Sequence, residues 1–192
     1  MPQARSTLIC FCFILGVRLP LCLAQSEALA EDPPFQNVYY YLDATTGKPI
    51  ELERQPSSTD MKSPGLGLGG LKAVVRIPGA TSSIRFPQGQ RVEFVFAVQP
   101  NVDPRTLVQF YRLESKKDHR EMVSAKGKPL TVGLTDRLTR DILPHKLVKY
   151  GPSSYKLIPG GDLAPGEYVF STPNTSASFC FGIDGVKNGV RK

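Results

Sequence analysis

The feature that most constrains the fold is the frequency of turn residues between short apolar runs. The chain of 192 residues holds 17 glycines and 17 prolines, and between them lie about ten short runs with strand character. The strongest is RVEFVFAV at 91–98, in which Val92, Phe94 and Phe96 share one face of an extended chain. Short strands at this spacing predict an all-β protein, and we expect an antiparallel immunoglobulin-like β-sandwich.

Several neighbouring runs are expected to pair as hairpins. The expected pairs are 37–43 with 49–54, 106–115 with 120–125, 146–150 with 154–158, and 167–171 with 177–184. Residues 134–143 are the one helical candidate, because Leu134, Leu138 and Ile142 are four residues apart and Pro144 ends the pattern. We therefore expect a short helical or irregular insertion there.

The N-terminus has the pattern of a secretory leader. Arg5 precedes an apolar run that begins at Leu8, and small-residue cleavage sites end at Ala24 and Ala30. Arg18 interrupts the apolar run and disfavours the alternative of an uncleaved membrane anchor. The expected organisation is a signal peptide at 1–30, one sandwich domain at 31–185 and a flexible tail at 186–192, with the protein exported to the periplasm or beyond.

Cysteine usage agrees with a domain that has no disulfide framework. Cys10, Cys12 and Cys22 would leave with the leader, so that Cys180 remains alone. In the stretch SASFCFGID we expect Cys180 to be a small buried hydrophobe. The alternative is a reactive or dimer-forming thiol.

The stretch DLAPGEYVF at 162–170 predicts a structural corner. In Greek-key sandwiches, a tyrosine that enters a late strand returns its hydroxyl to the backbone a few residues upstream. Leu163 would fill the gap between the sheets, Pro165 and Gly166 would make the turn, and Tyr168 would donate the hydrogen bond. A ligand-binding loop is the alternative interpretation.

This corner resembles that of fibronectin type III and other immunoglobulin-like domains. The chain has no Trp, and the expected domain has no paired cysteines, which excludes an antibody-type domain. The motifs VYYYLD, LERQ, SYKLIP, LAPGEY and FCFGID together resemble uncharacterised secreted bacterial proteins with a terminal PGEY…FGVD signature. The resemblance implies a sandwich fold but no activity and no site residues.

Motifs for catalysis or cofactor binding do not stand out. His119 and His145 lack neighbours at metal-ligand spacing, so we expect both to lie on the surface and expect no metal or other cofactor. The glycines at 65–70 are not followed by the Lys-Ser/Thr pair of a phosphate loop. A carboxylate pair for glycoside hydrolysis would come from the strand glutamates, but alternating glutamates typically mark a solvated face; these residues are Glu51, Glu53, Glu93 and Glu167.

The remaining functional signal is basic charge, formally +7 for the chain. Lys116, Lys117 and Arg120 gather on one predicted hairpin and form a candidate anion-binding site. Further basic residues would extend it if the two segments meet in space; these are Arg137, Arg140, Lys146 and Lys149. The alternative is a solvated face that keeps the domain soluble.

These observations favour an exported, non-catalytic sandwich that binds another protein or a component of the cell envelope. A polyanion or a glycan is a possible partner, and nothing requires a nucleic acid. In a glycan-binding module, an exposed aromatic such as Tyr39, Tyr41 or Tyr111 would carry the contact. A hydrolase of cell-wall or other polysaccharides is the enzymatic alternative.

Overall fold

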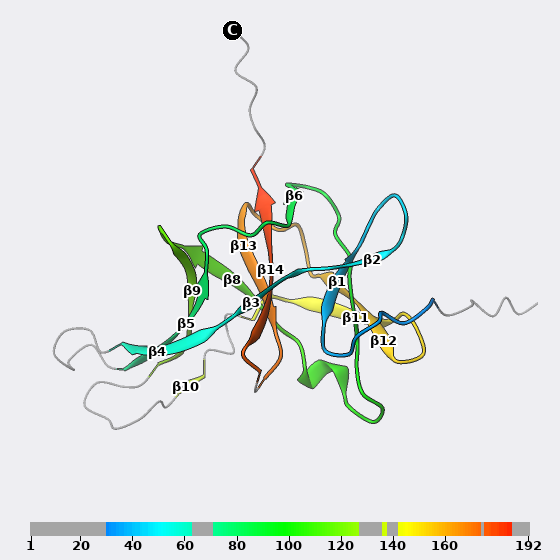
Figure 1. Cartoon of the computed structure of the whole chain (residues 1–192), viewed down its shortest axis with the longest axis horizontal. Coiled ribbons are helices and arrows are strands. Elements are labelled where there is room, and N and C mark those ends of the chain that lie inside the picture. The colour runs from blue at the N-terminus through cyan, green and yellow to red at the C-terminus, as the bar shows by residue number, and fades with distance from the viewer. Residues whose placement is uncertain (1–29, 63–70, 127–135, 138–141, 174, 186–192) are drawn as a thin grey trace, which may run out of the picture.

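The computed structural model describes residues 30–62, 71–126, 136–137, 142–173 and 175–185. These residues form a two-layer, predominantly antiparallel β-sandwich (Figure 1), which confirms the predicted all-β fold class. The first sheet has five strands in the order β11-β12-β7-β1-β2. Their bounds are His145–Lys149, Ser154–Pro159, Phe94–Ala97, Tyr39–Leu42 and Pro49–Glu51.

The second sheet is larger and curled. Its main path is β3-β14-β13-β8-β9-β5-β4, with β10 paired to β9 and β6 paired to β14. The strands on this path are Glu53–Pro56, Ala177–Asp184, Gly166–Ser171, Gln109–Ser115, His119–Lys126, Lys72–Pro78 and Ser58–Lys62. The two additional strands are β10 (Asp136–Arg137) and β6 (Arg85–Pro87), and β6 runs parallel to the end of β14.

The four predicted hairpins are confirmed. β1 pairs with β2, β8 with β9, β11 with β12 and β13 with β14. The helical candidate at 134–143 is wrong at residues 136–137, which pair with Lys126 and Ala125 of β9 as strand β10; residues 134–135 and 138–141 lie outside the described residues. Among the described residues the helical segment is a short 3₁₀ turn, η1, at Pro104–Thr106, where the Asp103 side chain accepts a hydrogen bond from the Arg105 N–H.

An aromatic core fills the space between the two sheets. Tyr39 of β1 stacks on Phe96 of β7 and on Phe170 of β13, with ring centroids 5.1 Å apart in both pairs. The ring centroids of Phe170 and Phe110 of β8 lie 4.6 Å apart. Side chains alternate between the two faces of a strand, and these rings lie on the faces that point into the space between the sheets. Aromatic rings bury large apolar areas, so this core is the main stabilising element.

A second, smaller core lies on the opposite face of the curled sheet. Ile77, Leu113, Val169 and Cys180 pack together there and are all buried. Burial raises the pKa of the Cys180 thiol to about 12, which fits the predicted small hydrophobe and disfavours a reactive thiol. The described part of the chain contains no helix with the length and hydrophobicity needed to cross a lipid bilayer.

Candidate functional site

A cleft of about 290 Å³ opens at one end of the sandwich. One wall is the segment Gly89–Val92 that leads from β6 into β7, and the other is residues 158–163, which end β12 and lead toward β13. Ile183 of β14 also lines it. Val92 and Ile183 are core residues that are almost fully buried, so the cleft reaches down to the aromatic core from outside.

The lining combines apolar and polar groups. Val92, Leu163 and Ile183 supply apolar surface, while Arg91 and Asp162 are exposed. A concave, mostly apolar surface with a few polar groups is typical of a ligand site. Arg91 and Asp162 carry opposite charges, so these two side chains give the cleft no net charge.

The tyrosine corner holds the second wall. The Tyr168 hydroxyl donates a 2.6 Å hydrogen bond to the Ala164 carbonyl, four residues upstream, as the sequence predicted. Gly166 has φ 152°, a conformation that side chains rarely adopt, and the Arg112 guanidinium lies where its Cβ would point. Arg112 also donates to the Pro165 carbonyl at 2.7 Å. Leu163 is part of both the corner and the cleft, so the stretch is scaffold and wall at once.

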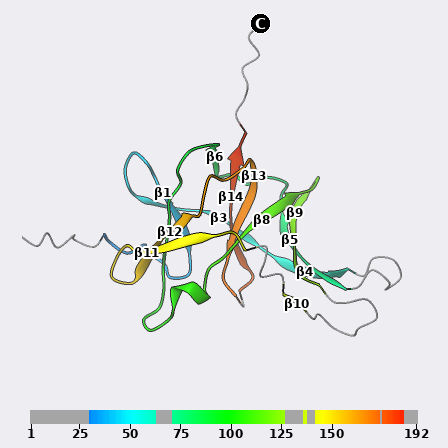
Figure 2. The ribbon, with the colours of Figure 1, turned by 180° about the vertical axis from the view of Figure 1, so that it is seen from behind.

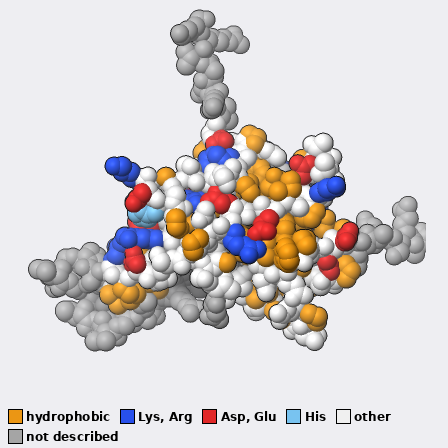
Figure 3. All heavy atoms as spheres, viewed as in Figure 1, with side chains coloured by type: hydrophobic (Ala, Val, Ile, Leu, Met, Phe, Trp, Pro, Cys, Tyr) orange, Lys and Arg blue, Asp and Glu red, His pale blue; other side chains and the backbone are white. Residues whose placement is uncertain are grey.

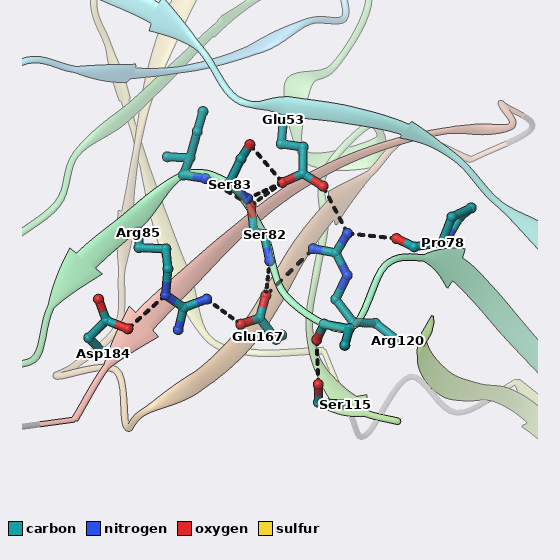
Figure 4. A network of polar contacts seen from close by, with 11 residues as sticks. Glu53, Pro78, Ser82, Ser83, Arg85, Ser115, Arg120, Glu167 and Asp184 are labelled. Atoms are coloured by element: carbon teal, nitrogen blue, oxygen red, sulfur yellow. Dashed lines mark hydrogen bonds and ion pairs between the residues drawn. The ribbon is translucent and has the colours of Figure 1, made fainter. Parts of the chain in front are cut away.

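A buried ionic network lies behind this corner (Figure 4). Arg120 of β9 is fully buried. Its guanidinium donates to Glu53 of β3 at 2.8 Å and to the Pro78 carbonyl at 2.9 Å, and it reaches Glu167 of β13 at 3.5 Å. Three strands of the curled sheet therefore meet on one arginine.

Glu53 is held in its charged form. Burial raises the pKa of its carboxyl, but hydrogen bonds from Ser82, Arg120 and Ser83 outweigh this and lower the pKa to about 2. The Ser82 hydroxyl donates to Glu53 at 2.7 Å, and the Ser82 N–H donates to Glu167 at 2.8 Å. The carboxyl groups therefore accept several hydrogen bonds within the network, whereas the buried Arg120 Nε has no hydrogen-bond partner.

Glu167 extends the network to β6, the strand that leads into the first wall of the cleft. The Arg85 guanidinium of β6 donates to Glu167 at 2.6 Å and to Asp184 of β14 at 2.7 Å. To do so it crosses over Gly182, where a Cβ would clash with an Arg85 nitrogen. Glycine at 182 therefore leaves the space that Arg85 occupies.

The predicted anion-binding site is not assembled. Arg120 is buried in the ionic network, so it cannot contact a polyanion at the surface. Lys116 is paired with Glu114 and lies 3.8 Å from Glu121, whereas Lys117 is exposed. Figure 3 shows basic and acidic side chains interleaved over β4, β5 and β9. For Arg120 the predicted surface contact is wrong because its guanidinium is buried and paired; an anion contact at Lys116 and Lys117 stays a prediction.

The second basic segment lies elsewhere. Lys146 and Lys149 belong to β11, at the edge of the first sheet. Figures 1 and 2 place β11 and the β8–β9 hairpin on opposite sides of the molecule. Arg140 and the side chain of Arg137 lie outside the described residues. The described basic residues therefore do not form one patch.

The tyrosines that would form a glycan platform are not arranged as one. Tyr39 is fully buried, and its hydroxyl donates to the Leu107 carbonyl at 3.1 Å. Tyr41 packs edge-on against Phe86, with centroids 5.1 Å apart. Tyr111 packs against the second core. Tyr39 and Tyr41 therefore pack with the main core and Tyr111 with the second core.

The histidines are partly buried and lie apart. A ring nitrogen of His119 is 2.7 Å from Asp118, and the other is 3.3 Å from Glu121. His145 packs against Phe110, with ring centroids 6.5 Å apart. Within the described ranges, no group of three or more potential metal-binding side chains comes together.

Comparison with known proteins gives no relative: no family, no curated protein and no solved structure matches this chain.

Proposed function

We propose that the protein is a non-catalytic binding module that takes an apolar group of a protein or of an envelope component into the cleft at the end of the sandwich. The observation that supports this is the cleft itself, whose two loop walls open onto Val92 and Ile183 of the core. Apolar surface that is reachable from solvent is where binding removes water most favourably.

The size of the cleft indicates a modest site. Burial of about 100 Å² of apolar ligand surface at about 25 cal/mol per Å² contributes roughly 2.5 kcal/mol. This is less than a millimolar dissociation constant requires, about 4 kcal/mol. The partner must therefore add contacts at the rim, where Gln90, Arg91 and Asp162 are exposed.

The position of the histidines also supports binding over hydrolysis. A hydrolase site would bring a histidine or a pair of carboxylates into a pocket. The described lining of the cleft holds one carboxylate, Asp162, and no histidine. Glu53 and Glu167 do lie close together, but they are fully engaged with Arg120, Arg85 and serine donors.

The neutral fluorophore N-phenyl-1-naphthylamine tests the cleft directly. We expect its fluorescence to rise on binding and its affinity to change little with salt, because the interaction is apolar. The blocking variant is Gly161→Phe, since Gly161 lines the cleft and no atom lies within 4 Å of a Cβ there, which leaves space for the new ring. We expect this variant to fold normally and to bind the probe at least tenfold more weakly, a loss of about 1.4 kcal/mol.

The matched control is Gln99→Phe, which adds the same ring at an exposed position outside the cleft lining. Unchanged probe binding by Gly161→Phe, or equal loss in both variants, would exclude the cleft as the site.

We also propose that the chain is exported and acts in the periplasm or outside the cell. The support is the leader-like N-terminus, with Arg5 before the apolar run and small residues at Ala24 and Ala30. The motif resemblance to secreted bacterial proteins points in the same direction.

A further inference from the structure

Two adjacent residues of β13 are each tied to one wall of the cleft. Glu167 and Tyr168 point to opposite faces of the sheet, as strand alternation requires. Glu167 enters the ionic network, and Tyr168 enters the aromatic core. Neither residue lines the cleft.

Glu167 is tied to the first wall through Arg85. The Arg85 guanidinium bridges Glu167 at 2.6 Å and Asp184 at 2.7 Å. Arg85 begins β6, which pairs with β14 over only three residues and leads directly into the wall at Gly89–Val92. So short a strand makes few backbone hydrogen bonds. Charge-assisted bonds to a nearly buried carboxylate are stronger than neutral ones, so the Arg85 bridge adds to the anchoring of this strand by Phe86, which is buried in the aromatic core.

Tyr168 is tied to the second wall through Ala164. Its hydroxyl donates to the Ala164 carbonyl at 2.6 Å, directly after Asp162 and Leu163, which line the cleft. The tyrosine ring is locked by stacking on Phe181, with centroids 5.3 Å apart. The second wall is therefore anchored to a rigid part of the core.

We infer that the Glu167–Tyr168 pair sets the width of the cleft and thereby its affinity for an apolar group. The inference rests on the proposed binding function. Both are positioning residues: they act through Arg85 and Ala164, and not by touching the ligand.

The experiment compares two hydroxyl deletions of the same kind. Tyr168→Phe releases the second wall. Tyr39→Phe is its matched control, because the Tyr39 hydroxyl is also buried and also donates to a backbone carbonyl, that of Leu107. Leu107 follows η1, which lies at the other end of the sandwich from β6 in Figures 1 and 2.

We expect N-phenyl-1-naphthylamine to bind Tyr168→Phe roughly three- to tenfold more weakly than wild type, the equivalent of part or all of one hydrogen bond. Tyr39→Phe should bind the probe like wild type despite a similar loss of stability. Arg85→Gln, which releases the first wall, should weaken binding in the same range, and Arg85→Lys should restore part of it.

Methyl NMR spectra separate this inference from the proposed function. The methyl groups of Val92, Leu163 and Ile183 report the cleft walls without any ligand. If wild type does not bind the probe, the proposed function fails, but shifted signals in Tyr168→Phe and not in Tyr39→Phe still support positioning. The inference would be overturned if probe affinity were unchanged in both Tyr168→Phe and Arg85→Gln. It would also be overturned if the methyl signals were unchanged in both variants.

Discussion

At the scale of single residues, the burial of Arg120 places one positive charge inside the fold, where it pairs with carboxylates and does not face solvent. A guanidinium with no exposed surface needs compensating partners, since an unpaired buried charge costs several kcal/mol. Glu53 and Glu167 provide them, and both are largely shielded from solvent, with 11% and 4% of their side chains exposed. The three residues are far apart in sequence, so no local pattern could reveal them as a unit.

Replacing Arg120 by Met should destabilise the fold by about 3–5 kcal/mol, because two carboxylates would remain without their central partner. Urea denaturation at neutral pH measures this change in the free energy of unfolding. The control is Arg54→Met, which removes an exposed ion pair with Glu51 and should cost no more than about 1 kcal/mol. A cost of under about 1 kcal/mol for Arg120→Met would contradict the structural role of the network.

The same network predicts a dependence on acid. The folded-state pKa of Glu53 is about 2, below its ordinary value of 4.5, so Glu53 contributes stability that is fully present above pH 4.5. That contribution is lost as the pH falls through 2. Wild-type stability should therefore decline across this window, and Glu53→Gln should show a smaller decline. An equal decline in both proteins would assign the acid sensitivity to other carboxylates.

At the scale of elements, the hairpins could be predicted and the pairing of distant strands could not. Turn residues and apolar alternation act over a few residues, and they indicated β1–β2 and β13–β14 correctly. Between β2 and β3 the chain passes from the first sheet to the curled sheet, and the residue between these strands, Leu52, is buried in the main core. After it Glu53 faces the network, so alternation alone wrongly suggested a solvated face.

The close approach of Arg85 to Gly182 gives a prediction for β6 and β14. Gly182→Ala should destabilise the protein, since its Cβ would clash with the Arg85 nitrogen that binds Glu167. In an Arg85→Ala background the guanidinium is gone and the Glu167 carboxylate oxygen, 2.9 Å from the Cβ, is the remaining close atom, so Gly182→Ala should cost less. The double-mutant cycle should therefore show a coupling of at least about 0.5 kcal/mol, as expected for residues in contact. Additive effects would show that Arg85 does not occupy this space in solution.

At the scale of the whole molecule, the cleft arises because the sandwich is closed by loops at this end. Its walls come from the connection between β6 and β7 and from the end of β12 with the connection to β13, and Ile183 of β14 also lines it. The sequence identified the corner at Tyr168 from a local pattern. It could not identify the cleft, because Gly89–Val92 and Ile183 are brought together only by the sheet topology.

The packing of the N-terminal segment distinguishes between the two candidate cleavage sites of the proposed leader. The Ala30 N–H donates to the Tyr150 carbonyl at 3.1 Å. Asp32 accepts hydrogen bonds from Ser153 and Ser154, including 2.6 Å from the Ser154 hydroxyl. Cleavage after Ala30 would remove the peptide N–H that bonds to Tyr150, whereas cleavage after Ala24 would keep it.

We therefore expect the exported protein to begin at Gln25. Intact-mass spectrometry of the periplasmic or secreted form, with N-terminal peptide sequencing, measures this directly. Asp32→Ala should lower the free energy of unfolding by about 1–3 kcal/mol, because the Ser153 and Ser154 donors lose their acceptor. An N-terminus at Glu31 would show that Ala30 is dispensable to the mature domain and would overturn this boundary while leaving export intact. An exported form that retains Met1 would contradict the leader itself. The hydrogen bonds of Asp32 do not depend on cleavage, so the predicted effect of Asp32→Ala on stability would still hold.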